Sequence, residues 1–162
     1  MSARTATPGG TVHRRLSALV ALAVLTAVPA AVAGKPPAGS DTGSGRVFLP
    51  NPVADLQDQS LTDRKDADYA ALQPAYHLVT LTNLDGSGFL RGDWADIAGE
   101  TGDPAYSATN TFHYGRSDDR FEQVMAYYWI TESQKYIQSL GFGSGLRSVN
   151  MEPQRLRINH GP

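Results

Sequence analysis

The sequence predicts an α+β fold: a β-hairpin-rich amino-terminal lobe with one long amphipathic helix, forming an incomplete domain. Residues 118–140 contain neither Gly nor Pro and place apolar side chains at helical spacings of three and four. Residues 76–84 instead alternate as a half-buried strand does, and the turn sequence DGSG follows them. Helix and strand signals that occupy separate blocks of the chain are typical of α+β architecture.

Length and composition limit the possible functions. The chain has 162 residues, 14 basic and 16 acidic side chains and no cysteine. This length corresponds to one domain, and the balance of charges disfavours nucleic-acid binding, which depends on neutralising phosphates. The lack of cysteine excludes disulfides, Cys-ligated zinc and a thiol nucleophile. Any chemistry must therefore come from His, Ser, Asp and Glu.

Residues 1–33 have the three parts of a secretory signal peptide. Three arginines without an acid come first, residues 16–28 are apolar, and Ala31-Val32-Ala33 matches a signal-peptidase site. The apolar run is shorter than the roughly 20 residues that span a bilayer. We therefore expect a secreted protein, cleaved near Ala33 and without a membrane anchor. An internal buried helix is the less favoured alternative, because a charge-free run between Arg-Arg and A-V-A is unusual in a globular interior.

Other features of the export signal concern its source and route. The Ala-rich signal is typical of a high-GC bacterium. The pair Arg14-Arg15 leaves twin-arginine export open. Removal of residues 1–33 would leave eleven basic and sixteen acidic side chains, a net charge of −5.

The mature chain is expected to start with a flexible linker. Residues 34–45, GKPPAGSDTGSG, are too polar and too rich in Gly and Pro to repay the entropy of ordering. Order is expected from Arg46, and residues 46–162 form the partial lobe. Pro50 and Pro52 predict extended backbone without a helix. The acidic segment 55–68 predicts a solvated surface connection rather than a calcium loop, because it lacks the EF-hand spacing.

Three elements are predicted within this lobe. Residues 76–97 form a hairpin in which Trp94 and Ile97 become buried. The helix at 118–140 begins with a capping box of Asp119 and Glu122 and stops at Gly141. Residues 154–159 are predicted to form a terminal strand. Because little chain follows this strand to close the fold around it, we expect the domain to be incomplete. The residues expected on the buried face of the helix are Phe121, Val124, Met125, Tyr128, Trp129, Ile137 and Leu140.

The residues indicate no catalytic, cofactor-binding or metal-ligating site. Ser87 is expected to be a turn residue, because the chain has no G-x-S-x-G elbow. Residues 141–145 lack the lysine of a phosphate-binding loop. His77, His113 and His160 lack the spacing of a zinc-binding helix, and we expect the first two to be hydrogen-bonded structural residues.

Three carboxylates leave two less favoured functions open, glycoside hydrolysis and calcium binding. Asp93, Asp96 and Glu100 offer an acid and a base for glycoside hydrolysis, but such pairs are defined by their separation in space. The same carboxylates are also compatible with a contribution to calcium binding. Both alternatives are less favoured than surface roles.

Three segments carry a resemblance to a known family: GRVFLPNP at 45–52, LTNLDGSGFLRG at 81–92 and DDRFEQVMAYYWITESQKYIQSLGF at 118–142. Together they resemble the amino-terminal part of secreted bacterial zinc metalloendopeptidases of the thermolysin and fungalysin type, over about two thirds of the chain. The resemblance implies a helix packed in a β-rich lobe. In the intact family, zinc is bound by an H-E-x-x-H helix and a further glutamate, and calcium is a possible second ion.

The resemblance also implies what this chain lacks. No zinc ligand or general base of the family maps onto any of its residues. We therefore expect a truncated, catalytically inactive amino-terminal fragment, a structural scaffold whose hairpin forms part of a substrate-cleft wall. Its partner would be the missing carboxy-terminal peptidase portion, with protein substrates bound only by the intact relative. The alternative is a self-contained secreted binding or interaction domain.

Overall fold

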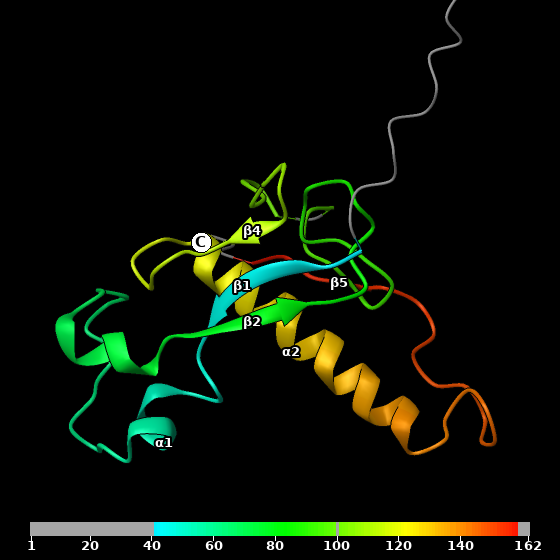
Figure 1. Ribbon diagram of the computed structural model, residues 1–162, viewed down its shortest axis with the longest axis horizontal. Coiled ribbons are helices and arrows are strands. Elements are labelled where there is room, and N and C mark those ends of the chain that lie inside the picture. Colours follow the sequence, from blue (N-terminus) through cyan, green and yellow to red (C-terminus); the bar gives the residue numbers. More distant parts are fainter. Residues whose placement is uncertain (1–40, 100, 159–162) are drawn as a thin grey trace, which may run out of the picture. The chain divides into compact units, whose positions relative to one another are not determined.

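The computed structural model describes residues 41–99 and 101–158 (Figure 1). The chain divides into two units, Met1–Ala33 and Gly34–Pro162, and all described residues belong to the second. The predicted signal peptide, most of the predicted linker, Glu100 and His160 lie outside the described residues. The described part combines short strands with one long helix and is α+β, as predicted.

The main sheet has three strands in the order β2-β1-β4. The middle strand β1 (Gly43–Val47) runs antiparallel to β2 (His77–Leu81) and parallel to β4 (Thr111–Phe112) (Figure 1). The three strands meet at Ser44 and Gly45. Ser44 pairs with Thr80 and Thr111, and Gly45 pairs with Val79 and Phe112.

β1 begins at Gly43, inside the segment that the sequence predicts to be a flexible linker. Its glycines serve close packing. A Cβ atom on Gly43 would lie 2.5 Å from the carbonyl oxygen of Asn110, and one on Gly45 would lie 2.9 Å from side-chain atoms of Leu81 and Val124. The prediction for residues 43–45 is therefore wrong, because a glycine-rich strand and a flexible linker have the same local composition.

The predicted hairpin at 76–97 is wrong in its strand pairing. β2 pairs along its whole length with β1, which lies earlier in the chain. The residues after the DGSG turn form isolated antiparallel bridges, which join Leu84 to Gly92, Phe89 to Tyr106 and Arg91 to Asp96. Glycine conformations at the turn follow the prediction, with φ of +75° at Gly86 and +83° at Gly88. Of the two residues expected to be buried there, Ile97 is fully buried and Trp94 half-buried.

A second, smaller sheet contains the chain's late strand. β3 (Ala95–Asp96) and β5 (Gln154–Arg155) pair in parallel. The predicted terminal strand at 154–159 is thus a two-residue strand within the described residues, and residue 159 lies outside them.

Two short helical turns precede β2. α1 (Pro52–Leu56) contradicts the expectation that the prolines exclude a helix, and η1 (Ala70–Ala75) is a 3-10 helix. Pro52 occupies the first turn of α1, where a missing N–H costs nothing. The side chain of Asn51 caps the helix by accepting a hydrogen bond of 2.9 Å from the N–H of Ala54.

The long helix α2 (Arg120–Ser139) confirms the predicted helix to within two residues at the amino end and one at the carboxyl end. The capping box is not formed, because the side chain of Asp119 makes no capping hydrogen bond. Asp118 instead accepts from the N–H of Arg120 at 3.0 Å. Gly141 stops the helix as predicted, with φ of +95°. Within the described part of the chain, no helix has the length and apolarity that crossing a membrane requires.

The main core lies between α2 and the sheet, behind β1 and β2 (Figure 1). Its largest side chains are Tyr127, Phe112 and Leu81, each with at most 1 % of its surface exposed. Phe121 belongs to a neighbouring cluster, where its ring packs 4.9 Å from that of Phe48. The amino-terminal half of α2 therefore supplies the apolar contacts that hold the helix to the sheet.

The predicted buried face of α2 is only partly right. Phe121 and Val124 are buried, and Met125, Tyr128 and Ile137 are half-buried. Trp129 and Leu140 are exposed. The face that turns inward carries Gln123, Tyr127, Thr131 and Gln134 instead.

Buried glutamines explain why α2 is rotated about its axis relative to the prediction, so that a different face turns inward. The side chain of Gln123 accepts from the N–H of Ala105 at 2.8 Å and donates to the carbonyl of Asp103 at 2.9 Å. Gln134 donates to the carbonyl of Val149 at 3.2 Å. The inward face thus satisfies backbone groups of neighbouring loops, which costs less than leaving those groups buried without partners.

Candidate functional site

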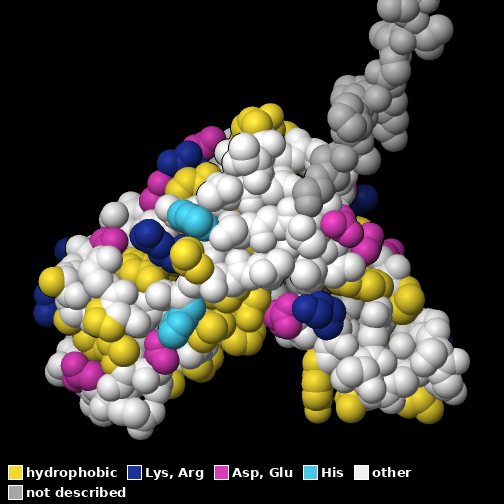
Figure 2. All heavy atoms as spheres, viewed as in Figure 1, with side chains coloured by type: hydrophobic (Ala, Val, Ile, Leu, Met, Phe, Trp, Pro, Cys, Tyr) yellow, Lys and Arg dark blue, Asp and Glu magenta, His cyan; other side chains and the backbone are white. Residues whose placement is uncertain are grey.

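Both histidines in the described residues make hydrogen bonds, as predicted. Nε2 of His77 lies 2.6 Å from Oδ2 of Asp55, and Nε2 of His113 lies 2.7 Å from Oγ of Ser44. Figure 2 shows the two histidine side chains on the same face of the molecule. The first pair ties α1 to β2, and the second ties β1 to the residue that follows β4. These contacts join separate elements and are consistent with structural roles.

Ser44 and His113 have the spacing of a nucleophile and its base, but their surroundings do not complete a site. The N–H of Ser44 already donates to the carbonyl of Asn110 at 2.8 Å and is not available to stabilise an oxyanion. The pair is solvent-exposed on the sheet. We therefore assign it to strand alignment.

Asp93 and Asp96 border one open hollow of about 480 Å³. Asp93 accepts from the side-chain amide of Asn83 at 3.0 Å. Asp96 accepts from Nε of Arg91 at 3.1 Å and from the N–H of Gly99 at 2.8 Å. Both carboxylates thus stabilise local turns. Over residues 41–99 and 101–158, no three His, Asp or Glu side chains are grouped so that they could hold a metal ion.

Ser87 is a turn residue, as predicted. Its N–H donates to Oδ1 of Asp85 at 2.8 Å, and its Oγ accepts from the N–H of Phe89 at 3.3 Å. Residues 141–145 also form a closed turn, in which the carbonyl of Gly141 accepts from the N–H of Gly145 at 3.0 Å.

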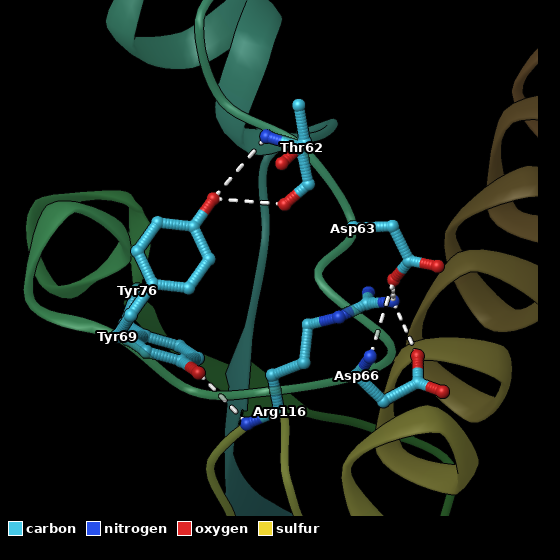
Figure 3. A network of polar contacts seen from close by, with 6 residues as sticks. All are labelled: Thr62, Asp63, Asp66, Tyr69, Tyr76 and Arg116. Carbon is cyan, nitrogen blue, oxygen red and sulfur yellow. Dashed lines mark hydrogen bonds and ion pairs between the residues drawn. The ribbon is translucent and has the colours of Figure 1, made fainter.

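Arg116 is a charged residue whose role the sequence analysis missed. Figure 3 shows its guanidinium beside the carboxylates of Asp63 and Asp66, with which it forms ion pairs. Its backbone N–H donates to the hydroxyl of Tyr76 at 2.8 Å. The two acids lie 53 and 50 residues earlier in the chain, so no local sequence signal connects them to Arg116.

These ion pairs hold a turn with an unusual backbone. Arg64, Lys65 and Asp66 follow one another with φ of +48°, +54° and +62°. Such left-handed conformations cost about 1 kcal/mol or more for each non-glycine residue. Tyr69 closes the turn by donating to the carbonyl of Thr62 at 2.9 Å (Figure 3). Residues 62–68 of the acidic segment are exposed, as predicted, whereas Asp55 and Asp58 are half-buried. The exposed part is held at two points, by Arg116 and by Tyr69.

Replacing Arg116 with alanine is expected to release this turn. Trypsin should then cleave after Arg64 or Lys65 roughly tenfold faster, because local opening controls proteolysis. The matched control is Arg147→Ala, which removes an exposed arginine elsewhere in the chain. Time courses followed by mass spectrometry measure the rates. Equal cleavage of the two variants at residues 64 and 65 would contradict the anchoring role.

An apolar hollow of about 200 Å³ lies beside Arg116. Phe48, Val53, Leu61 and Leu72 contribute to its walls. Small-molecule sites usually measure about 300–1,000 Å³. The hollow is therefore too small to be the leading candidate for a functional site.

Two carboxyl groups at the start of α2 have pKa values shifted in opposite directions. Arg120 donates to Asp118 through Nε at 2.9 Å and Nη2 at 2.7 Å, and these bonds lower the pKa of Asp118, with burial opposing them. Burial raises the pKa of Glu122, and the nearby charge of Asp66 adds to this effect. Arg120 also lies over the ring of Tyr114, 4.5 Å from its centroid.

Asp118→Asn is expected to lower the free energy of unfolding by about 0.5 kcal/mol at pH 7, since both members of the ion pair are partly exposed. A carboxyl whose pKa is lowered on folding stabilises the protein above its unfolded-state pKa, about 3.9. This contribution is lost as pH falls through the folded-state pKa. Urea titrations between pH 7 and pH 2 should therefore show the free energies of unfolding of the parent chain and of Asp118→Asn becoming equal as the pH falls. A difference that is constant over this range would refute the assignment.

The carboxyl-terminal half of α2 has the clearest unexplained surface. We name this surface the α2 stripe and define it as Trp129, Ser133, Tyr136, Ile137 and Leu140. Exposed fractions are 36 % for Trp129, 65 % for Tyr136 and 52 % for Leu140. Figure 2 shows hydrophobic side chains gathered where the carboxyl end of α2 lies in Figure 1.

The α2 stripe contains a hollow and is apolar. Trp129, Ser133, Tyr136 and Ile137, together with Glu132, line an open hollow of about 410 Å³. The ring of Trp129 is held edge to face against that of Tyr128, with centroids 5.2 Å apart. Clustered exposed aromatic residues of this kind are typical of protein–protein contact surfaces. The stripe is therefore the candidate functional site, and its character is that of a contact surface.

Comparison with known proteins adds no relative to this description. No family model, curated protein or solved structure matches the chain.

Proposed function

We propose that this chain is a secreted, non-catalytic structural lobe of a zinc metallopeptidase-like protein, and that it packs against a carboxy-terminal peptidase portion. The observation that carries the proposal is the contrast between the two halves of α2. Phe121, Val124 and Tyr127 in the first half are at most 1 % exposed, whereas Tyr136 and Leu140 in the second half are more than half exposed.

The energetics of the helix support this proposal. Burying a large apolar side chain stabilises a protein by about 1.5–3 kcal/mol. The side chains of the α2 stripe do not provide most of this stabilisation, because they remain largely exposed. A further layer of structure on the stripe would recover it. In the family that the sequence resembles, additional structure including the active-site helix belongs to the same protein, which makes the peptidase portion the natural occupant.

The polar contacts support a lobe that is inactive alone. His77, His113, Asp93 and Asp96 each make hydrogen bonds that align local structure. In this proposal, zinc is a cofactor of the missing portion and none of these residues binds it. Export would follow cleavage near Ala33, giving an extracellular protein.

The nucleotide sequence beyond the codon for Pro162 tests the proposal directly. A reading frame that encodes H-E-x-x-H there, followed by a glutamate ligand, is the expected result. The lack of such a motif in every frame would overturn the proposal. Hydrolysis of casein by the purified chain with added Zn²⁺, abolished by EDTA, would also overturn it. Amino-terminal sequencing of protein from the culture medium should give Gly34 as the first residue.

A self-contained interaction domain is the second candidate, and the closed core favours it. Val47, Ala95, Ile97, Phe112 and Tyr127 are fully buried in one core cluster. This candidate predicts the same inactivity but no H-E-x-x-H sequence downstream. The nucleotide sequence therefore separates the two.

A further inference from the structure

We infer that this chain binds a neutral oligosaccharide in an open hollow between residues 85–96 and residues 151–153. The inference does not depend on the proposed peptidase portion, because no residue of the α2 stripe lines this hollow. It rests on the size of the hollow, on one indole ring in its wall and on the hydrogen-bonding groups at its rim.

The hollow has a suitable size and is built by the smaller sheet. Its volume is about 480 Å³, and small-molecule sites usually measure about 300–1,000 Å³. β3 and β5 pair in parallel, with Ala95 opposite Gln154. Trp94 and Pro153 directly precede these two residues, so the register brings them together as walls of the hollow. The carbonyl of Trp94 accepts from the N–H of Gln154 at 2.9 Å, which fixes this arrangement.

Trp94 provides a platform for the apolar face of a sugar ring. Its side chain is half-buried, so the lobe holds part of it while another part borders the hollow. Met151, which is 52 % exposed, adds a second apolar wall. A pyranose ring carries C–H bonds on its faces and hydroxyl groups around its edge. The C–H face can pack on the indole ring, and the hydroxyl groups are then directed to the polar rim.

Two carboxylates at the rim are held in place and can still accept hydrogen bonds. Oδ1 of Asp85 accepts from the N–H of Ser87 at 2.8 Å. Oδ2 of Asp93 accepts from the side-chain amide of Asn83 at 3.0 Å. Both aspartates are exposed, and each has a second oxygen to which a sugar hydroxyl can donate. Because local hydrogen bonds already orient these carboxylates, little ordering is required when a ligand binds.

The mixture of charges around the hollow favours a neutral ligand. Asp85, Asp93 and Asp96 border it together with Arg91. Nε of Arg91 donates to Asp96 at 3.1 Å, and the guanidinium has further N–H donors at its end. A cationic ligand would meet this guanidinium, and an anionic ligand would meet the carboxylates. Hydroxyl groups both donate and accept, so a neutral sugar can pair with groups of either charge.

A second open hollow extends the site and favours an oligosaccharide over a single sugar. Its volume is about 440 Å³, and it shares Asp96 and Pro153 with the first hollow. Glu152, Gln154 and Arg155 also line it, so donors and acceptors again lie side by side. Because both hollows are open to solvent, we expect weak binding, with a dissociation constant on the order of 0.1–1 mM.

Fluorescence titration tests the inference. The chain has two tryptophans, Trp94 and Trp129. In the variant Trp129→Phe, tryptophan emission therefore reports on Trp94 alone. The probes are three neutral tetrasaccharides, cellotetraose, mannotetraose and N-acetylchitotetraose, each added separately to the purified variant. The expected result is a saturable change in the emission of Trp94 with at least one of them.

Calorimetric titration of further variants locates the site. Trp94→Ala should weaken binding by roughly tenfold or more, because the stacking platform is lost. Asp93→Asn retains an oxygen for Asn83 but replaces the other acceptor with an amide, and should weaken binding roughly three- to tenfold. Asp103→Asn is the matched control, because Asp103 is exposed, lies outside both hollows and should leave the affinity unchanged. If circular dichroism shows that Trp94→Ala is unfolded, Asp93→Asn decides.

Three results would contradict the inference. The first is an emission of Trp94 that responds to no tetrasaccharide up to about 10 mM, ten times the weakest expected dissociation constant. The second is equal affinity of Asp93→Asn and Asp103→Asn, which would place binding elsewhere on the chain. The third is a response to casein-derived peptides and to none of the sugars, which would identify a peptide-binding surface instead. The proposed peptidase portion would stand in each case, because the downstream nucleotide sequence tests it.

Discussion

Replacing Tyr127 with alanine is expected to lower the free energy of unfolding by about 3–5 kcal/mol, the range for truncating a large buried aromatic side chain. Tyr127 has no exposed surface, and its ring lies in the main core with Val47, Phe112 and Ile97. Its hydroxyl also donates to the carbonyl of Thr82 at 2.8 Å. The substitution therefore leaves both a cavity and an unpaired carbonyl.

Urea denaturation followed by circular dichroism measures this loss. Tyr136→Ala is the matched control, because it removes the same side chain from the same helix at a position that is 65 % exposed. We expect it to change the free energy of unfolding by less than about 0.5 kcal/mol. Similar losses for the two variants would mean that the amino-terminal half of α2 does not hold the core.

The same measurement should show a second large effect at Gly92. A Cβ atom there would lie 1.8 Å from the carbonyl oxygen of Asn83 and 2.6 Å from the hydroxyl oxygen of Tyr127. The first obstacle is backbone, which is itself held because that carbonyl accepts from the N–H of Asp93 at 3.1 Å. Gly92→Ala must therefore separate two chain segments and is expected to cost more than about 3 kcal/mol.

Gly102 supplies the control for this substitution. A Cβ atom at Gly102 meets nothing within 4 Å, so Gly102→Ala should lie within about 0.5 kcal/mol of the parent chain. If Gly92→Ala does not fold, loss of its helical circular dichroism, with the signal of Gly102→Ala intact, confirms the prediction. Equal stability of the two variants would contradict the close approach of residues 83 and 92.

Local signals were sufficient to predict α2. A stretch of 20 helical residues without Gly or Pro, ended by a glycine, needs no distant contact to be recognised. The roles of Ser87 and Gly141 were predicted for the same reason, since turn conformations depend on a few neighbouring residues. The hydrogen-bonded state of His77 and His113 was also expected, although their partners were not.

Predictions that depended on pairing were less successful. The sequence around DGSG favoured a hairpin, whereas β2 pairs with the glycine-rich β1. Arg116 had no local signal because Asp63 and Asp66 lie about 50 residues away in the chain. The same limitation applies to Gly43 and Gly45, whose neighbours are visible only once the strands are assembled.

The sequence by itself determined the α+β class, the position of the long helix and the turn glycines, because backbone propensity and apolar periodicity are local properties. Tertiary structure alone decided which side of α2 faces inward. Gln123 and Gln134 satisfy backbone groups of distant loops, and this rotation leaves Trp129, Tyr136 and Leu140 at the surface. Apolar spacing identifies a helix, but the partners of its buried polar groups decide which face it buries.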